Sequence, residues 1–155
     1  MSGLKWVDVA NIEGDDKGGR TSWIMVSEKT VGSQNLGIGL NETHVGGMVP
    51  KHKHETEEEV MYFFQGKGQF ITDDEVIELK PGICVFNPPG AFHSIVNTGD
   101  EILKFIWIYS PQLPSQRIDK KYKEEKYDKM ELPTFRRPHG QAFRNLFSND
   151  DQTPD

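Results

Sequence analysis

Two segments decide the fold of this chain: GGMVPKHKHETEEEVMYFFQG (residues 46–66) and GICVFNPPGAFHSIVN (residues 82–97). Together they supply three imidazoles, from His52, His54 and His93, and a run of carboxylates. His52 and His54 are two residues apart, so on a strand they would project from the same face. Nitrogen and oxygen donors of this kind suit a divalent first-row transition metal. The two segments therefore predict a metal site carried by strands.

Short apolar runs recur along the first 110 residues about every ten residues, with turn residues between them, a spacing typical of an all-β barrel or sandwich. Two of the expected strands carry the histidines. The others cover residues 4–12 (a lead-in strand), 22–27, 35–43, 60–65, 69–72, 75–79, 83–86 and 102–109. We expect the barrel to occupy residues 1–112. Residues 113–155 are expected to form a partly helical or extended C-terminal arm that packs on the barrel or on a partner subunit.

The two segments resemble the motifs of the cupin family. The first motif, G-x5-H-x-H-x4-E-x6-G, is filled by Gly46, His52, His54, Glu59 and Gly66. The second motif, G-x5-P-x-G-x2-H-x3-N, is filled by Gly82, Pro88, Gly90, His93 and Asn97. Two ordered blocks are far more specific than one short motif. The resemblance implies a cupin-type double-stranded β-helix, or jelly-roll barrel. It also implies that the metal ligands are His52, His54, Glu59 and His93.

A closed barrel turns alternate residues inward, which extends the prediction to a pocket. Glu59 lies five residues after His54, so the chain must bend between them, and the resemblance implies that it does. Met61 and Phe63 then face inward with Glu59, and Ile95 shares a face with the last motif histidine. We expect Met61, Phe63 and Ile95 to form a substrate pocket beside the metal. Glu59 could dissociate in part and act as a catalytic base.

Simpler interpretations exist for several of these residues. His52 and His54 lie between lysines and could belong to a solvated basic strand, and Met61 and Phe63 are more often core residues than substrate contacts. Glu58 is the alternative to Glu59 as the acidic ligand. A further group is expected to have no role in chemistry: His44 and His139 at the surface, Asn97 as a hydrogen-bonding residue at a strand end, and Cys84 as an inert buried thiol.

Arginine is absent from residues 21–110. Arginine is the preferred clamp for carboxylate or phosphate groups, and Lys51 and Lys53 have the opposite parity to the histidines. The substrate should therefore bind by metal chelation and apolar contact, as a small neutral or monoanionic molecule. This expectation about the substrate changes only if an arginine from outside residues 21–110 folds over the mouth of the barrel. The candidates are Arg20, Arg136, Arg137 and Arg144.

The composition limits the partners. The chain has 155 residues, a net charge of −6 and one cysteine. An acidic chain argues against nucleic acid and anionic membrane surfaces, and a single cysteine fits a reducing cytoplasm. No signal peptide is evident, and the most apolar run, residues 102–109, is too short to span a bilayer. We expect a cytoplasmic homodimer that pairs through an outer sheet face, because strands 60–64 and 102–109 are apolar on both sides.

The leading functional hypothesis is an enzyme with one divalent metal ion (Mn, Fe, Ni, Co or Zn) acting as a Lewis acid. The substrate would be a small organic molecule with carbonyl or hydroxyl donors, and the reaction a lyase, hydrolase, isomerase or decarboxylase step. An iron- or nickel-dependent dioxygenase is one alternative, because cupins with this ligand set perform both kinds of chemistry. A cupin that binds a small molecule without catalysis is the other.

Overall fold

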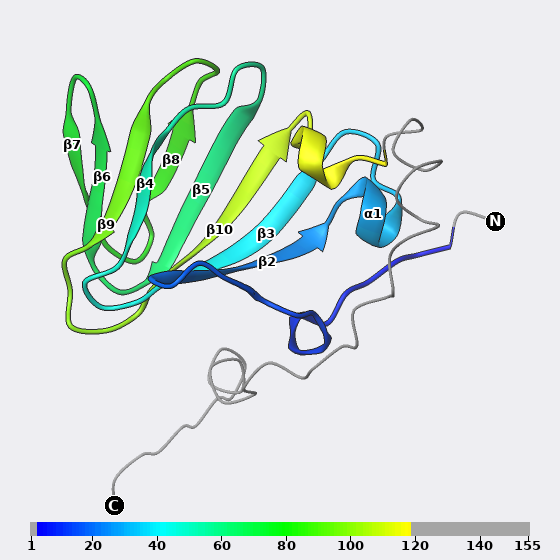
Figure 1. Ribbon diagram of the computed structural model, residues 1–155, viewed down its shortest axis with the longest axis horizontal. Coiled ribbons are helices and arrows are strands. Elements are labelled where there is room, and N and C mark those ends of the chain that lie inside the picture. Colours follow the sequence, from blue (N-terminus) through cyan, green and yellow to red (C-terminus); the bar gives the residue numbers. More distant parts are fainter. Residues whose placement is uncertain (1–2, 119–155) are drawn as a thin grey trace, which may run out of the picture.

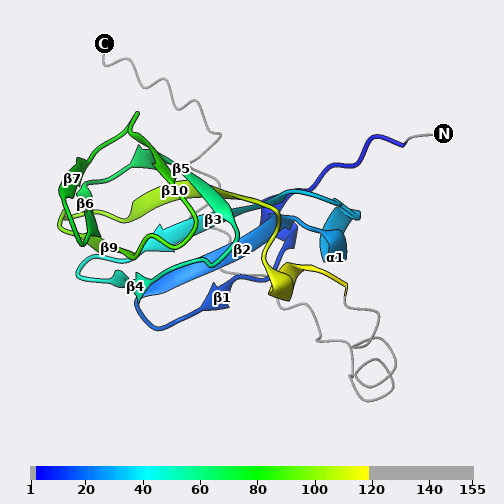
Figure 2. The same cartoon turned by 90° about the horizontal axis from the view of Figure 1, so that it is seen from above.

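The computed structural model describes residues 3–118, which form two antiparallel sheets that face each other (Figure 1). The six-stranded sheet has the order β1-β2-β3-β10-β5-β8, and the four-stranded sheet has the order β4-β9-β6-β7. The strands are β1 Asp15–Asp16, β2 Arg20–Val26, β3 Gly37–Thr43, β4 Met48–His52, β5 Glu58–Gln65, β6 Gly68–Thr72, β7 Val76–Leu79, β8 Cys84–Asn87, β9 His93–Asn97 and β10 Leu103–Ser110. Seen from above, the strands surround an interior (Figure 2). The prediction of an all-β jelly roll is confirmed.

The interior is built from alternate residues of β5 and β10, which pair in antiparallel register. Phe63 lies opposite Phe105, and Met61 lies opposite Trp107. The Phe63 and Phe105 rings pack with their centroids 4.8 Å apart. Gly39 of β3 makes room for the Trp107 indole, because a Cβ there would lie 2.0 Å from that ring. These residues belong to one apolar core that fills the barrel below the metal-ligand candidates.

The opposite face of the six-stranded sheet carries a second, smaller apolar cluster. Trp23 and Leu40 pair across β2 and β3, and Val9 packs on them together with Phe64 and Ile106. A buried ion pair lies on the same face, where the Lys104 ammonium is 2.9 Å from Glu42 Oε1. The apolar character of β5 and β10 on both sides is therefore used within the chain, at least for Phe64 and Ile106.

Three short helices complete the described chain. The α-helix α1 spans Glu28–Val31 and the two 3-10 helices span Val9–Asn11 and Pro114–Gln116. The predicted lead-in strand over residues 4–12 is wrong, because the Asp8 carboxylate accepts a hydrogen bond from the Ala10 N–H and closes a turn there instead. Leu4 and Trp6 stay 92 % and 79 % exposed.

Cys84 is exposed, so its prediction as a buried thiol is also wrong. In β8 the residues that face the interior are Val85 and Asn87, which leaves Cys84 and Phe86 on the outside. Residues 119–155, which include His139 and most of the expected arm, lie outside the described part of the chain. The boundary between barrel and arm stays a prediction. Within residues 3–118, none of the helices has the length and apolarity needed to cross a membrane.

Candidate metal centre

The three motif histidines come together at one end of the barrel. One ring nitrogen from each of His52, His54 and His93 lies within 4.8 Å of the others. The two-residue spacing predicted that His52 and His54 share one strand face. The structure differs, because β4 ends at His52 and His54 lies in the loop that follows. That loop is held by the second motif, because the Gly90 N–H donates a hydrogen bond of 2.7 Å to the His54 carbonyl.

Glu59 brings a carboxylate to the same point. It lies near the start of β5 and is 3 % exposed, and its Oε2 is 3.1 Å from His93 Nε2 and 3.5 Å from His54 Nε2. The Tyr109 hydroxyl hydrogen-bonds to this carboxylate from the facing position on β10. Glu58, the alternative acidic ligand, is exposed because the adjacent residue of a strand faces the other way.

The surroundings of Glu59 keep it ionised. Burial alone would raise the pKa of this carboxyl, but the contacts with His54, His93 and Tyr109 outweigh burial and lower the pKa from 4.5 to about 2. Burial and the adjacent carboxylate raise the pKa of Tyr109, so its hydroxyl stays a neutral donor.

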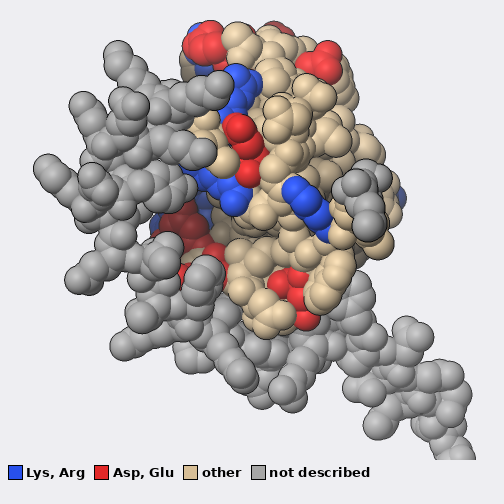
Figure 3. Space-filling model, turned by 90° about the vertical axis from the view of Figure 1, so that its right-hand side faces the viewer, with Lys and Arg blue, Asp and Glu red and all other residues tan. Residues whose placement is uncertain are grey.

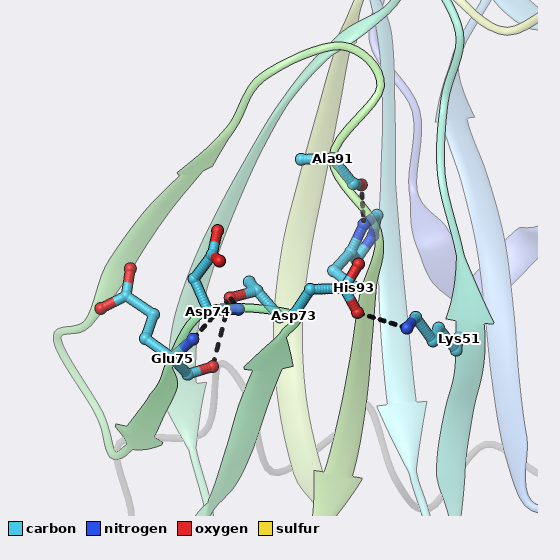
Figure 4. A network of polar contacts seen from close by, with 7 residues as sticks. Lys51, Asp73, Asp74, Glu75, Ala91 and His93 are labelled. Carbon is cyan, nitrogen blue, oxygen red and sulfur yellow. Dashed lines mark hydrogen bonds and ion pairs between the residues drawn. The ribbon is translucent and has the colours of Figure 1, made fainter.

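Backbone carbonyls orient two of the imidazoles. His52 Nδ1 lies 2.7 Å from the Pro50 carbonyl oxygen, and His93 Nδ1 lies 3.2 Å from that of Ala91 (Figure 4). A carbonyl can only accept, so Nδ1 of His52 carries the hydrogen and its Nε2 keeps the lone pair. His93 Nδ1 also lies 3.0 Å from the Asn87 amide nitrogen, which is a donor, so the contacts of His93 fit either tautomer. Burial, as the largest cause, lowers the pKa of His52, which favours the neutral imidazole that a metal requires. Metal-bound histidines are held by carbonyls in this way.

The contact between His93 and Glu59 tests whether a metal fits. His93 Nε2 and Glu59 Oε2 are 3.1 Å apart, which is ion-pair distance when Nε2 carries a proton. In the described part of the chain, Glu59 Oε2 and His54 Nε2 are buried without a hydrogen-bond partner of good geometry. A metal ion that replaced the imidazole protons would be coordinated by the nitrogens and by the carboxylate. Three nitrogens and one carboxylate oxygen suit a first-row transition metal, so the residues fit such an ion.

A cavity of about 330 Å³ extends from this cluster into the barrel. His52, His93, Glu59 and Tyr109 line one part of it, and Val49, Met61, Ile95, Phe105 and Trp107 form an apolar wall. Met61 and Ile95 thus lie where the pocket was predicted. Phe63 does not line the cavity: it is 0 % exposed and packs below it in the core.

The two lysines beside the histidines point outside. Lys51 forms an ion pair with Asp73 (Figure 4), and Lys53 Nζ lies 2.8 Å from Glu55. Both ammonium groups lie about 5 Å from the centre of the Phe92 ring, at 5.2 and 5.3 Å. On the face shown in Figure 3, positive and negative side chains lie side by side rather than gathering by sign.

The structure also places His44 and Asn97, two residues that were expected to have no role in chemistry. His44 is half-buried, 3.5 Å from the Thr21 hydroxyl and outside the histidine cluster. The Asn97 side chain donates to the Thr43 and Glu101 carbonyls and accepts from Gly99, so its role as a strand-end hydrogen-bonding residue is confirmed.

Among the residues that line the cavity, Tyr109 was not predicted and Arg20 was named only as an exception. Tyr109 faces inward with the other odd-numbered residues of β10, and this alternation was visible in the sequence. Arg20 also lines the cavity, together with Lys17. Arg20 shares parity with Ser22 and would have been found by extending the expected strand 22–27 backward by two residues. Arg20 is therefore the arginine from outside residues 21–110 that reaches the cavity in the described part of the chain.

Comparison with known proteins agrees with this geometry. Residues 39–109 match the family model described as Cupin domain. With the jelly-roll fold and the motif residues in place, residues 39–109 form a cupin domain. Its structural neighbours include a predicted oxalate decarboxylase from Thermotoga maritima (TM-score 0.61, 26 % identity, 68 % of this chain and 98 % of that one). They also include the polyketide cyclase RemF from Streptomyces resistomycificus (TM-score 0.64, 18 % identity, 79 % and 94 %), a likeness that concerns the fold.

The relatives found by sequence similarity also include one oxalate-related protein and one polyketide protein. The oxalate-binding protein of Thermotoga maritima is 39 % identical over 61 residues, which is 39 % of this chain and 50 % of that protein. The polyketide synthase CurC of Streptomyces cyaneus is 29 % identical over 112 residues, 72 % of this chain and 73 % of that one. An uncharacterized protein of Methanocaldococcus jannaschii, MJ1618, is 39 % identical over 62 residues. The match spans half the length of MJ1618 and of the oxalate-binding protein.

Proposed function

We propose that this chain is a metal-dependent enzyme that acts on a small organic molecule with carbonyl or hydroxyl oxygens. The observation that carries the proposal is the convergence of three imidazoles and one ionised carboxylate at a cavity with an apolar wall. One divalent ion (Mn, Fe, Ni, Co or Zn) would be held by His52, His54, Glu59 and His93. When bound, such an ion would act as a Lewis acid that polarises a chelating carbonyl and stabilises negative charge developing on its oxygen.

The protein residues have separate tasks in this proposal. The Pro50 carbonyl holds the His52 imidazole in the tautomer that presents Nε2, and the Ala91 carbonyl and the Asn87 amide orient the His93 ring through Nδ1. Tyr109 fixes the Glu59 carboxylate, which serves as a ligand. A second role of Glu59 as a base requires that it leave its contacts with Tyr109 and the imidazoles. Met61, Ile95 and the rest of the apolar wall exclude water and position the substrate beside the ion.

The reaction class proposed is redox-neutral: a lyase, hydrolase, isomerase or decarboxylase step. Two similar proteins support this choice, since one is named a predicted oxalate decarboxylase and the other the polyketide synthase CurC. A dioxygenase would use the same ligands with iron or nickel, and a binding protein would use the cavity without turnover.

The test is turnover with candidate chelating substrates, namely β-diketones, β-keto acids and oxalate, before and after removal of metal by a chelator. The proposal expects activity that is lost on chelation, restored by one metal, and not accompanied by oxygen uptake at an oxygen electrode. Oxygen uptake that follows substrate loss would establish the dioxygenase instead. Binding of these compounds without any turnover in the metal-loaded protein would establish the binding protein.

The proposed assembly is a cytoplasmic homodimer that pairs through an outer sheet face. Tyr62 on β5 is 46 % exposed and Ile108 on β10 is half-buried, so apolar surface remains on this face of the described chain. Sedimentation velocity at micromolar concentration should show a dimer, and a monomer at all concentrations would contradict this proposal.

A further inference from the structure

The cavity has a cation at the end away from the histidines. Arg20, the first residue of β2, lines the cavity and is half-buried. Its guanidinium donates a hydrogen bond of 3.3 Å to the Met48 carbonyl at the start of β4. This contact joins β2 of the six-stranded sheet to β4, the edge strand of the four-stranded sheet, beside the cavity. A guanidinium has five N–H donors, so several are left for a ligand.

The charge of Arg20 is not neutralised by a carboxylate in the described part of the chain. The nearby lysine, Lys17, is paired with Asp15 at 2.5 Å, so these two lining residues cancel each other. Among residues 3–118, Arg20 takes part in no ion pair. The far end of the cavity thus has a net charge of about +1, which matches a monoanion such as a carboxylate better than a dianionic phosphate.

The two polar ends of the cavity are separated by a known length of strand. Arg20 is bonded to Met48, the first residue of β4, and His52 is the last residue of the same strand. Four residues at about 3.3 Å each place the two ends about 13 Å apart along the backbone. Between them, the cavity wall is apolar and includes Val49, Ile95 and Trp107. A ligand that reaches both ends needs an elongated apolar middle.

We infer that the substrate carries a carboxylate at the end remote from its chelating oxygens, and that Arg20 binds this carboxylate. The substrate is then an elongated monoanion: a chelating carbonyl head, an apolar middle and a carboxylate tail. This inference rests on the proposed function for the head group, whereas the role of Arg20 stands on its own geometry. Arg20 is a specificity-determining residue, and it lies too far from the histidines to be a catalytic one.

The test uses two matched probes: acetylacetone extended by an alkyl chain that ends in a carboxylate, and the corresponding primary amide. Calorimetry on the metal-loaded protein should show the acid binding about tenfold tighter than the amide, as expected for a charge-assisted contact. Arg20→Gln should remove this preference and leave the metal content unchanged. Arg20→Lys should keep part of it, since the charge stays but the planar fork is lost.

Arg117→Gln is the matched control, because Arg117 also donates one hydrogen bond to a backbone carbonyl, that of Gln112, and does not line the cavity. It should keep the full preference for the acid. Equal binding of acid and amide by the wild type, or a preference that persists in Arg20→Gln, would overturn the inference.

A second pair of probes separates this inference from the proposed function. Hexanoate and hexanamide need no metal, and hexanoate alone should bind measurably to the metal-free protein through Arg20. If the protein binds no metal, the proposed function fails while an Arg20-dependent preference for hexanoate still supports the carboxylate site. If metal and turnover are found but neither acid is preferred, the carboxylate site fails and the proposed function stands.

Discussion

Two buried glutamates lie on opposite faces of the six-stranded sheet and differ in the groups that face them. Glu42 on β3 lies 2.9 Å from the ammonium of Lys104, on the face away from the cavity. Glu59 on β5 lies inside the barrel, 3.1 Å from His93 Nε2 and 3.5 Å from His54 Nε2. One carboxylate contacts a permanent cation of the chain, and the other contacts ring nitrogens.

This difference separates a structural site from a binding site. A buried ion pair is complete without any added group, although the desolvation of both charges limits its net stabilising effect. The Glu59 carboxylate instead faces imidazoles, whose protons a metal ion can replace because metal binding requires the neutral ring. Mutations at the two glutamates should therefore have separable effects, on the stability of the fold for Glu42 and on metal binding for Glu59.

The largest effect on stability is expected from Glu42→Gln. It removes one partner of a buried ion pair, which costs about 3–5 kcal/mol of unfolding free energy. Urea unfolding measures the loss, and elemental analysis of the folded fraction should find the wild-type metal content. Replacing Glu42 and Lys104 together with apolar residues of similar size should recover most of the stability. Loss of metal in Glu42→Gln would erase the distinction between the two sites.

The next effect is the pH dependence that Glu59 gives to the metal-free protein. Its pKa is lowered from 4.5 to about 2 in the folded state, so the ionised carboxylate stabilises the fold above about pH 4.5. This contribution, on the order of 3 kcal/mol, is lost as the pH falls from about 4.5 towards 2. Urea unfolding across this window should show a steeper loss for the wild type than for Glu59→Gln. Equal slopes would contradict the assignment.

A smaller effect is expected from Tyr109→Phe, which removes the hydroxyl that holds the Glu59 carboxylate. Residues that orient metal ligands typically change metal affinity by 10- to 100-fold, and we expect about tenfold here. Competition with a metal-binding dye measures the affinity. Tyr62→Phe is the matched control, since Tyr62 lies on the outside of the same sheet and is 46 % exposed. Equal affinities in the two variants would rule out a positioning role for Tyr109.

Local sequence was sufficient to predict most of the strands, because turn residues and alternation are local properties. The convergence of the histidines with Glu59 came from the motif resemblance, because alternation alone would not bring Glu59 to the same side as His54. The motif spacing to Gly66 also selected Glu59 over Glu58, and the structure leaves Glu58 exposed. Prediction from local sequence was less reliable where a side chain makes a local hydrogen bond. Asp8 closes a turn in a segment whose alternation had predicted a strand.

The remaining features depend on which distant strands pair, and no local pattern encodes this. Tyr109 meets Glu59 only because β10 and β5 pair in this register. Arg20 reaches the cavity at a point where β2 of one sheet contacts Met48 on β4, the edge strand of the other. Phe63 faces inward like Met61 but does not line the cavity. Alternation therefore predicted the direction of its side chain and not its depth in the barrel.

The most direct test of the account is elemental analysis of the protein purified without a histidine tag, beside the variants His52→Ala, His93→Ala and His44→Ala. The account predicts about one equivalent of a divalent transition metal in the wild type and in His44→Ala, since His44 lies outside the cluster. It predicts loss of that metal in the other two variants. A wild-type protein without metal that takes up none on reconstitution, or His93→Ala with undiminished metal, would contradict the central claim that these residues form a metal site.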